Sequence, residues 1–63
     1  MNLQIMETLG DKLKKARKAA GLSQAQLADM LNTQWQQVSR WERNVAEPRK
    51  ETREALAKAL GLP

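Results

Sequence analysis

The 63-residue sequence contains no cysteine, histidine, phenylalanine or tyrosine. Without cysteine there is no disulfide framework, and without cysteine or histidine only carboxylates remain to bind a metal, so a zinc site is not expected. The chain has no glycine-rich phosphate loop, and its two serines lack a triad-type base, which argues against an enzyme. It also lacks a signal peptide and an apolar run near 18 residues, so no membrane span is expected. We expect neither a cofactor nor a small-molecule effector.

Basic residues exceed acidic ones by 11 to 7, which gives a formal net charge of +4 and a pI near 10.0. A basic balance in a small domain favours a polyanionic partner, although the same charge also serves solubility alone. Alanine, leucine, lysine, glutamine, glutamate and arginine dominate, and all of these favour helices. The composition predicts one all-α domain over residues 1–63.

Four helical segments are predicted from the spacing of apolar residues, at about 8–20, 23–31, 33–43 and 49–60. Each segment carries one apolar face that should pack into a shared core. The residues expected on these faces are Leu9, Leu13, Ala16 and Ala20, then Leu27, Ala28 and Leu31, then Val38, Trp41 and Val45, and finally Ala55, Leu56, Ala59 and Leu60.

Two capping-box patterns mark helix starts, Ser23 with Gln26 and Thr33 with Gln36. Glycine and asparagine tolerate the left-handed conformation that ends many helices. The segments at 23–31 and 33–43 are therefore short and joined by a tight turn, the spacing of a helix-turn-helix over about 23–43. The residues expected to end the helices are Gly21, Asn32, Asn44 and Gly61.

Four stretches, taken in order, resemble one family of regulators: "GLSQAQLADMLN" at 21–32, "VSRWERN" at 38–44, "EP" at 47–48 and "LAKALGLP" at 56–63. They are similar to the Cro/C1-type helix-turn-helix family of lambdoid phage repressors, and the similarity covers nearly the whole chain. Asn32 and Asn44 stand where that family usually has glycine. The resemblance implies a compact four- to five-helix lambda-repressor-like bundle and a transcriptional regulator, acting most often as a repressor. It further implies a bacterial or phage-encoded protein in the cytoplasm, associated with the nucleoid.

The resemblance also implies that the segment at about 34–43 is a recognition helix lying in the major groove of double-stranded DNA. Glutamine can pair with adenine and arginine with guanine through their major-groove edges. Trp35 could pack against a thymine methyl group or a sugar, or it could instead cover the neighbouring chain. The residues expected to contact bases are Gln34, Trp35, Gln36, Gln37 and Arg40.

Residues flanking this helix are expected to bind phosphates, with solvated surface residues as the alternative. Gln24 is assigned by the resemblance, because that position opens the second helix. The other candidates are Arg43, Asn44, Arg49 and Lys50. The operator is expected to be pseudo-palindromic and bound by a homodimer. The family often adds a fifth helix for dimer contacts, so the sequence is expected to be a truncated domain or a very small complete regulator.

Two charges border apolar faces, Arg17 in the first helix and Glu42 in the third. Isolated charges are rarely left beside a core, because desolvation costs several kcal/mol per ion. Opposite signs on two facing helices predict a partly or fully buried ion pair, and the resemblance implies the same pair. Trp41 is expected to belong to the core rather than to the DNA surface.

Two other readings remain open on sequence alone. The chain could be a helical protein-interaction module, such as an antitoxin or a coactivator domain. It could also bind RNA, although RNA recognition usually adds stacking aromatic residues and only Trp35 qualifies. Salt-dependent binding to duplex DNA would separate these readings, because phosphate-dominated binding weakens steeply with salt.

Overall fold

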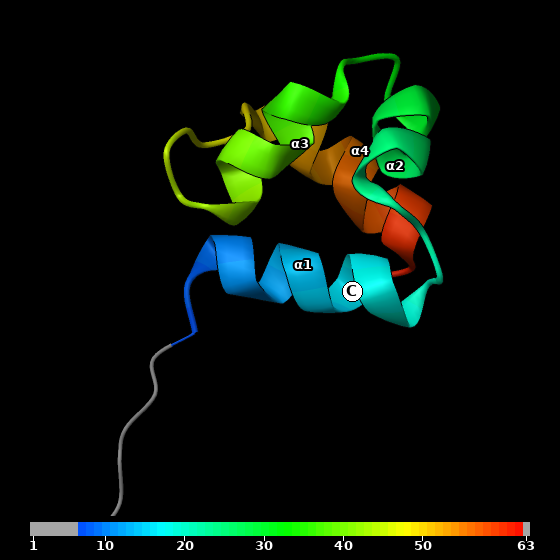
Figure 1. The fold of residues 1–63 in the computed structure, drawn as a ribbon, viewed down its shortest axis with the longest axis horizontal. Coiled ribbons are helices and arrows are strands. Elements are labelled where there is room, and N and C mark those ends of the chain that lie inside the picture. The colour runs from blue at the N-terminus through cyan, green and yellow to red at the C-terminus, as the bar shows by residue number, and fades with distance from the viewer. Residues whose placement is uncertain (1–6, 63) are drawn as a thin grey trace, which may run out of the picture.

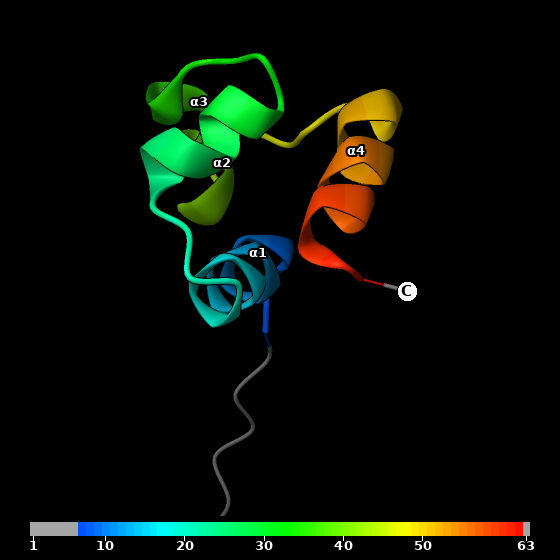
Figure 2. The same cartoon turned by 90° about the vertical axis from the view of Figure 1, so that its right-hand side faces the viewer.

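The computed structural model describes residues 7–62 of the chain, which form four helices and no strand. The helices are α1 (Leu9–Ala19), α2 (Gln24–Met30), α3 (Trp35–Glu42) and α4 (Lys50–Leu60). Helix α1 runs beneath α3 and α2 (Figure 1). The view turned by 90° shows α1 nearly end-on, with α2 and α3 on one side and α4 on the other (Figure 2). The predicted all-α architecture is confirmed.

The starts of α1 and α2 are held by reciprocal capping boxes. At α2 the backbone N–H of Gln26 donates to the Ser23 hydroxyl at 3.0 Å, and the N–H of Ser23 donates to the Gln26 amide oxygen at 2.8 Å. At α1 the same exchange joins Thr8 and Asp11 at 3.1 and 3.2 Å. Each box satisfies two N–H groups that a helix start leaves without intrahelical partners. The predicted box at Ser23 is confirmed.

All four helices end at a left-handed residue, which follows the C-cap in α1, α2 and α3 and is the C-cap itself in α4. In α2 the N–H of Thr33 donates to Ala28 O at 2.9 Å and that of Asn32 to Asp29 O at 3.1 Å, the two bonds of a Schellman motif. Equivalent pairs of bonds close the other three helices. The left-handed residues are Gly21, Asn32, Asn44 and Gly61, with φ of 74°, 58°, 61° and 67°.

The predicted capping box at Thr33 is wrong. Helix α3 begins one residue later, with Gln34 as its N-cap, and its start has no side-chain cap hydrogen bond. The reason is that Thr33 belongs to the Schellman motif that ends α2, so the turn uses one more residue than the pattern suggested. Helices α2 and α3 are thus joined by residues 31–34 and pack closely against each other.

The core lies where all four helices meet. Its buried apolar residues are Leu13, Leu27, Ala28, Val38, Trp41 and Leu56. Leu27 and Val38, at the centre of the helix-turn-helix, have no exposed surface. Residues Leu31, Ala59 and Leu60 pack against this cluster while half-buried.

Three residues expected in the core are exposed. Leu9 is 47% exposed, Ala20 is also exposed, and the buried face of α1 instead carries Gly10, Leu13 and Arg17. Val45 is 57% exposed. It follows Asn44, whose positive φ turns the chain away from the axis of α3, so the helical spacing no longer applies there.

Candidate functional site

The outer face of α3 carries the candidate base-contacting residues. Val38, Trp41 and Glu42 are buried on one side of the helix, so at 3.6 residues per turn Gln36 and Arg40 point directly away from the core. All five candidates, Gln34, Trp35, Gln36, Gln37 and Arg40, are exposed. They extend from the N-cap through the first two turns of α3 and form one exposed surface, polar except for Trp35.

This surface has two flanks. On one flank a shallow groove is lined by Trp35, Gln36, Ser39, Arg40, Arg43 and Val45. On the other flank Gln37 lies at the edge of a hollow between α3 and the start of α4, together with Thr33, Arg49 and Thr52. The structure therefore brings Gln36 and Arg40 together with Trp35, while Gln37 faces toward Arg49.

Helices α3 and α4 differ from α1 and α2 at their starts. Within residues 7–62, the N-caps of α3 and α4 are Gln34 and Arg49, and neither side chain bonds to the helix that it begins. The first N–H groups of a helix are unpaired donors with a positive potential, which suits an anion such as phosphate. The start of α3 thus belongs to the candidate surface itself, and the start of α4 lies beside the hollow on its Gln37 flank.

Four of the five phosphate candidates are exposed, namely Arg43, Asn44, Arg49 and Lys50. Gln24 is half-buried, and its side-chain amide donates to Glu42 Oε1 at 3.1 Å. That bond orients Gln24 at the start of α2 and leaves the second amide hydrogen for another acceptor.

Asn44 is held differently from the other candidates. Its amide oxygen accepts from the N–H of Gly10 at 3.1 Å, and its amide nitrogen donates to the Thr8 hydroxyl at 2.9 Å. Both polar ends of the side chain are thus committed to the start of α1. Asn44 fastens α1 to the end of α3, a role that the sequence did not suggest, and its second amide hydrogen remains for another acceptor. Its contact with phosphate stays a prediction.

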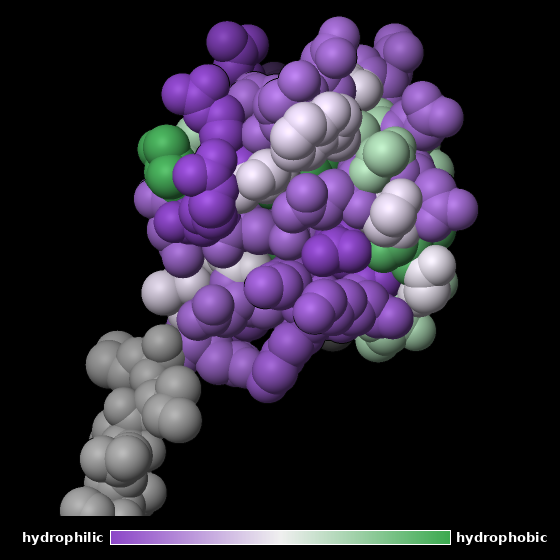
Figure 3. All heavy atoms as spheres, in the orientation of Figure 1, coloured by the Kyte–Doolittle hydropathy of each residue, from purple (hydrophilic) through white to green (hydrophobic). Residues whose placement is uncertain are grey.

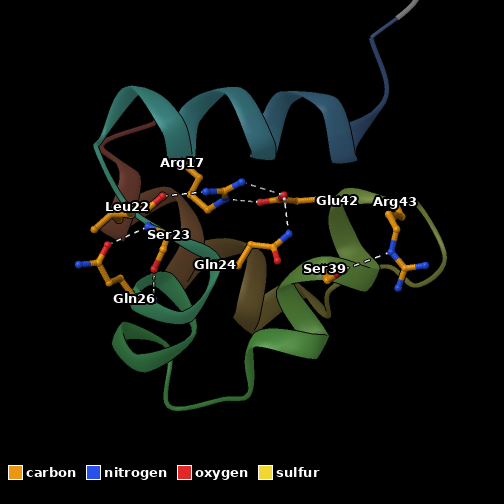
Figure 4. Close-up of polar contacts among 8 residues, drawn as sticks. All are labelled: Arg17, Leu22, Ser23, Gln24, Gln26, Ser39, Glu42 and Arg43. Atoms are coloured by element: carbon orange, nitrogen blue, oxygen red, sulfur yellow. Dashed lines mark hydrogen bonds and ion pairs between the residues drawn. The ribbon is translucent and has the colours of Figure 1, made fainter.

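The expected pair of Arg17 and Glu42 is present and buried (Figure 4). Arg17 Nε donates to Glu42 Oε2 at 2.6 Å and Nη2 donates to Oε1 at 3.2 Å, while Nη1 donates to the carbonyl of Leu22 at 2.7 Å. The side chains are 9% and 3% exposed. Together with Gln24, these bonds occupy the donors and acceptors that burial would otherwise leave unpaired. The network joins α1, the start of α2 and the end of α3.

Gly10 was also missed by the sequence reading. A Cβ built on it would lie 2.5 Å from Glu42 O and 2.7 Å from Trp41 O, so only glycine allows α1 to approach the end of α3 this closely. The available signal was a glycine inside an otherwise helical pattern, which often marks a close packing contact. The candidate recognition helix α3 is thus held against α1 by Gly10, Asn44 and the Arg17–Glu42 pair.

The outer face of α1 is strongly basic and solvated, with exposed Lys12, Lys14, Lys15 and Lys18. Lys15 pairs with Glu7, and this hydrogen bond and charge raise the pKa of the Lys15 ammonium above its ordinary value. The space-filling view shows a mostly hydrophilic surface over this helix (Figure 3). The lysines lie away from the outer face of α3 and form no part of the candidate site.

Residues 7–62 offer neither a metal site nor a membrane-spanning helix. No group of three or more potential ligand side chains could hold a metal ion there. Across the same residues, none of the helices combines the length and the apolar character that a membrane crossing requires.

Comparison with known proteins gives two matches. A family model described as helix-turn-helix matches residues 13–63. Among solved structures, the P22 c2 repressor protein in complex with synthetic operator 9T in the presence of Tl+ matches with a TM-score of 0.88 and 33% identity, over 92% of this chain and 88% of that chain. A comparison with curated proteins gives no match. The residues that the family model matches include the helix-turn-helix and the positions of Arg17 and Glu42.

Proposed function

The chain belongs to the Cro/C1-type helix-turn-helix family, and we propose that it is a sequence-specific regulator of transcription that binds double-stranded DNA through α3. The observation that carries this proposal is the exposed polar face of α3, backed by a fully buried opposite face. A solved relative of the same fold is a repressor bound to an operator. In such proteins the second helix of the motif enters the major groove.

Gln36 and Arg40 are the central base-reading residues of this proposal. Both point away from the core, and their side chains carry the donor and acceptor patterns that match adenine and guanine. Gln34, Trp35 and Gln37 surround them at the start of α3 and complete the surface that meets the base edges.

Phosphates on either side of the groove are bound by the flanking residues. Gln24 is oriented for this by Glu42, and Arg49 and Lys50 lie at the uncapped start of α4. Arg43 continues the α3 surface toward its C-terminal end. These contacts set the position of the protein on the duplex without reading its sequence.

A single recognition helix meets only a few base pairs, so specificity requires two copies. The proposed complex is a two-fold homodimer on a pseudo-palindromic operator with half-sites about 10 base pairs apart. The proposed location is the bacterial cytoplasm with the DNA, and no cofactor or effector is required. Footprinting at saturation should protect both half-sites, and protection of one isolated half-site would contradict the dimer.

Gln36→Ala and Arg40→Ala are each expected to weaken binding to the preferred duplex by about 1–3 kcal/mol and to relax selection at one base position. Duplexes selected from a random pool provide the site, and fluorescence anisotropy provides the affinities. Arg49→Ala is the matched control, because loss of a phosphate contact should weaken specific and random duplexes alike. Equal weakening on both duplexes by Gln36→Ala would contradict its role in base reading.

Trp35 is expected to report DNA binding, because half of its surface is exposed beside Gln36 and Arg40. A Trp41→Phe variant leaves Trp35 as the only emitter, since the chain contains two tryptophans. The fluorescence emission of Trp35 should change as the selected duplex is added until the protein is saturated. Unchanged emission at saturation would mean that Trp35 covers the protein surface and does not enter the groove. Thermal melting of the variant checks that it remains folded.

A further inference from the structure

Arg43, at the end of α3, forms a side-chain hydrogen bond with Ser39, one helical turn earlier. Its Nε donates to the hydroxyl of Ser39 at 3.2 Å. The close-up shows the guanidinium of Arg43 lying back along α3 beside Ser39 (Figure 4). Ser39 is half-buried and anchored in the helix, whereas Arg43 is exposed at the helix end. The serine therefore restrains a long side chain that would otherwise sample many rotamers.

The bond selects which part of the guanidinium remains available. With Nε facing Ser39, the terminal nitrogens Nη1 and Nη2 form the free edge, a pair of parallel donors that matches two oxygens of one phosphate. Ser39 and Arg43 line the same groove as Gln36 and Arg40. The restrained edge thus lies next to the base-reading surface.

We propose that Ser39 is a positioning residue, which holds Arg43 so that its two terminal nitrogens bind one phosphate of the DNA backbone next to the bases read by Arg40. This inference rests on the proposed DNA contact of Arg43. An unrestrained arginine loses its rotamer freedom when it binds, and the bond to Ser39 removes part of that freedom in advance. Ser39 itself makes no contact with DNA in this arrangement.

The test compares Ser39→Ala, Arg43→Ala and the double variant on the selected duplex and on a random duplex, at several salt concentrations. Ser39→Ala should weaken binding about threefold to tenfold, as expected for the loss of one hydrogen bond, and equally on both duplexes. Arg43→Ala should weaken binding further. It should also reduce the slope of log affinity against log salt concentration by the amount expected for about one phosphate contact. Ser39→Ala keeps the charge and should keep most of this slope. The double variant should bind like Arg43→Ala alone.

Ser39→Thr is the conservative control, because it keeps a hydroxyl at the same place and should bind nearly as tightly as the original chain. Melting curves separate positioning from folding, since alanine favours the helix at least as well as serine and should not lower stability. The inference is overturned if Ser39→Ala has no effect, or if it weakens binding by the same factor when Arg43 is already alanine. Absence of salt-dependent duplex binding by the unchanged chain would instead contradict the proposed function itself.

Discussion

Glu42→Gln and Arg17→Met are each expected to lower the free energy of unfolding by about 3–5 kcal/mol. Each change leaves the other member of a buried pair without its partner, and the two side chains are only 3% and 9% exposed. A stranded charge in that position has lost water and gained no opposite charge. For a 63-residue domain such a loss is a large part of the total stability. Removal of an exposed pair would cost only about 0–1 kcal/mol.

Thermal and urea melts of the two single variants and of their combination measure this effect. The double variant should lose less stability than the sum of the single variants, because neither charge is then stranded. Near-original stability in both single variants would contradict the buried pair. Glu42→Gln should also weaken the hydrogen bond that orients Gln24, because its acceptor changes from a carboxylate to a neutral amide. The affinity of this variant for random duplexes should therefore fall as well.

The helix ends and the buried ion pair were predictable from the sequence. Gly21, Asn32, Asn44 and Gly61 mark the helix ends because only residues that tolerate positive φ fit there. The Arg17–Glu42 pair was also predictable, since opposite charges bordering two apolar faces have few other low-energy arrangements. The assignment of base reading to the exposed residues of α3 came from the resemblance together with the chemistry of glutamine and arginine, and it stays a prediction.

Three features were not predictable from helical spacing and capping patterns. The buried face of α1 includes Gly10 and Arg17, which are not apolar side chains. A prediction that counted only apolar residues therefore assigned Leu9 and Ala20 to this face, and both are exposed. The side chain of Asn44 looked free for phosphate because its partners lie 34 and 36 residues away. Thr33 matched a capping pattern, but the end of α2 extends through it, and a local pattern does not reveal where the preceding helix stops.

Gly10→Ala is expected to destabilise the domain by about 3 kcal/mol, although alanine is intrinsically the better helix former. The added Cβ would meet Glu42 O at 2.5 Å, Trp41 O at 2.7 Å and Asn44 Oδ1 at 2.8 Å. Two of these atoms are backbone, so relief requires α1 to move away from α3. Such a move stretches the bond from the Gly10 N–H to Asn44 and opens the contact beside the buried ion pair.

Gly21→Ala is the matched control, because nothing lies within 4 Å of a Cβ there and its cost comes from the positive φ of 74° alone. That cost should be about 1 kcal/mol. The free energy of unfolding measured by urea melts should therefore be clearly lower for Gly10→Ala than for Gly21→Ala. An unchanged or raised stability in Gly10→Ala would mean that the start of α1 does not lie against the end of α3. In that case Asn44 would not fasten α1 either, and Asn44→Ala would leave the melt unaltered.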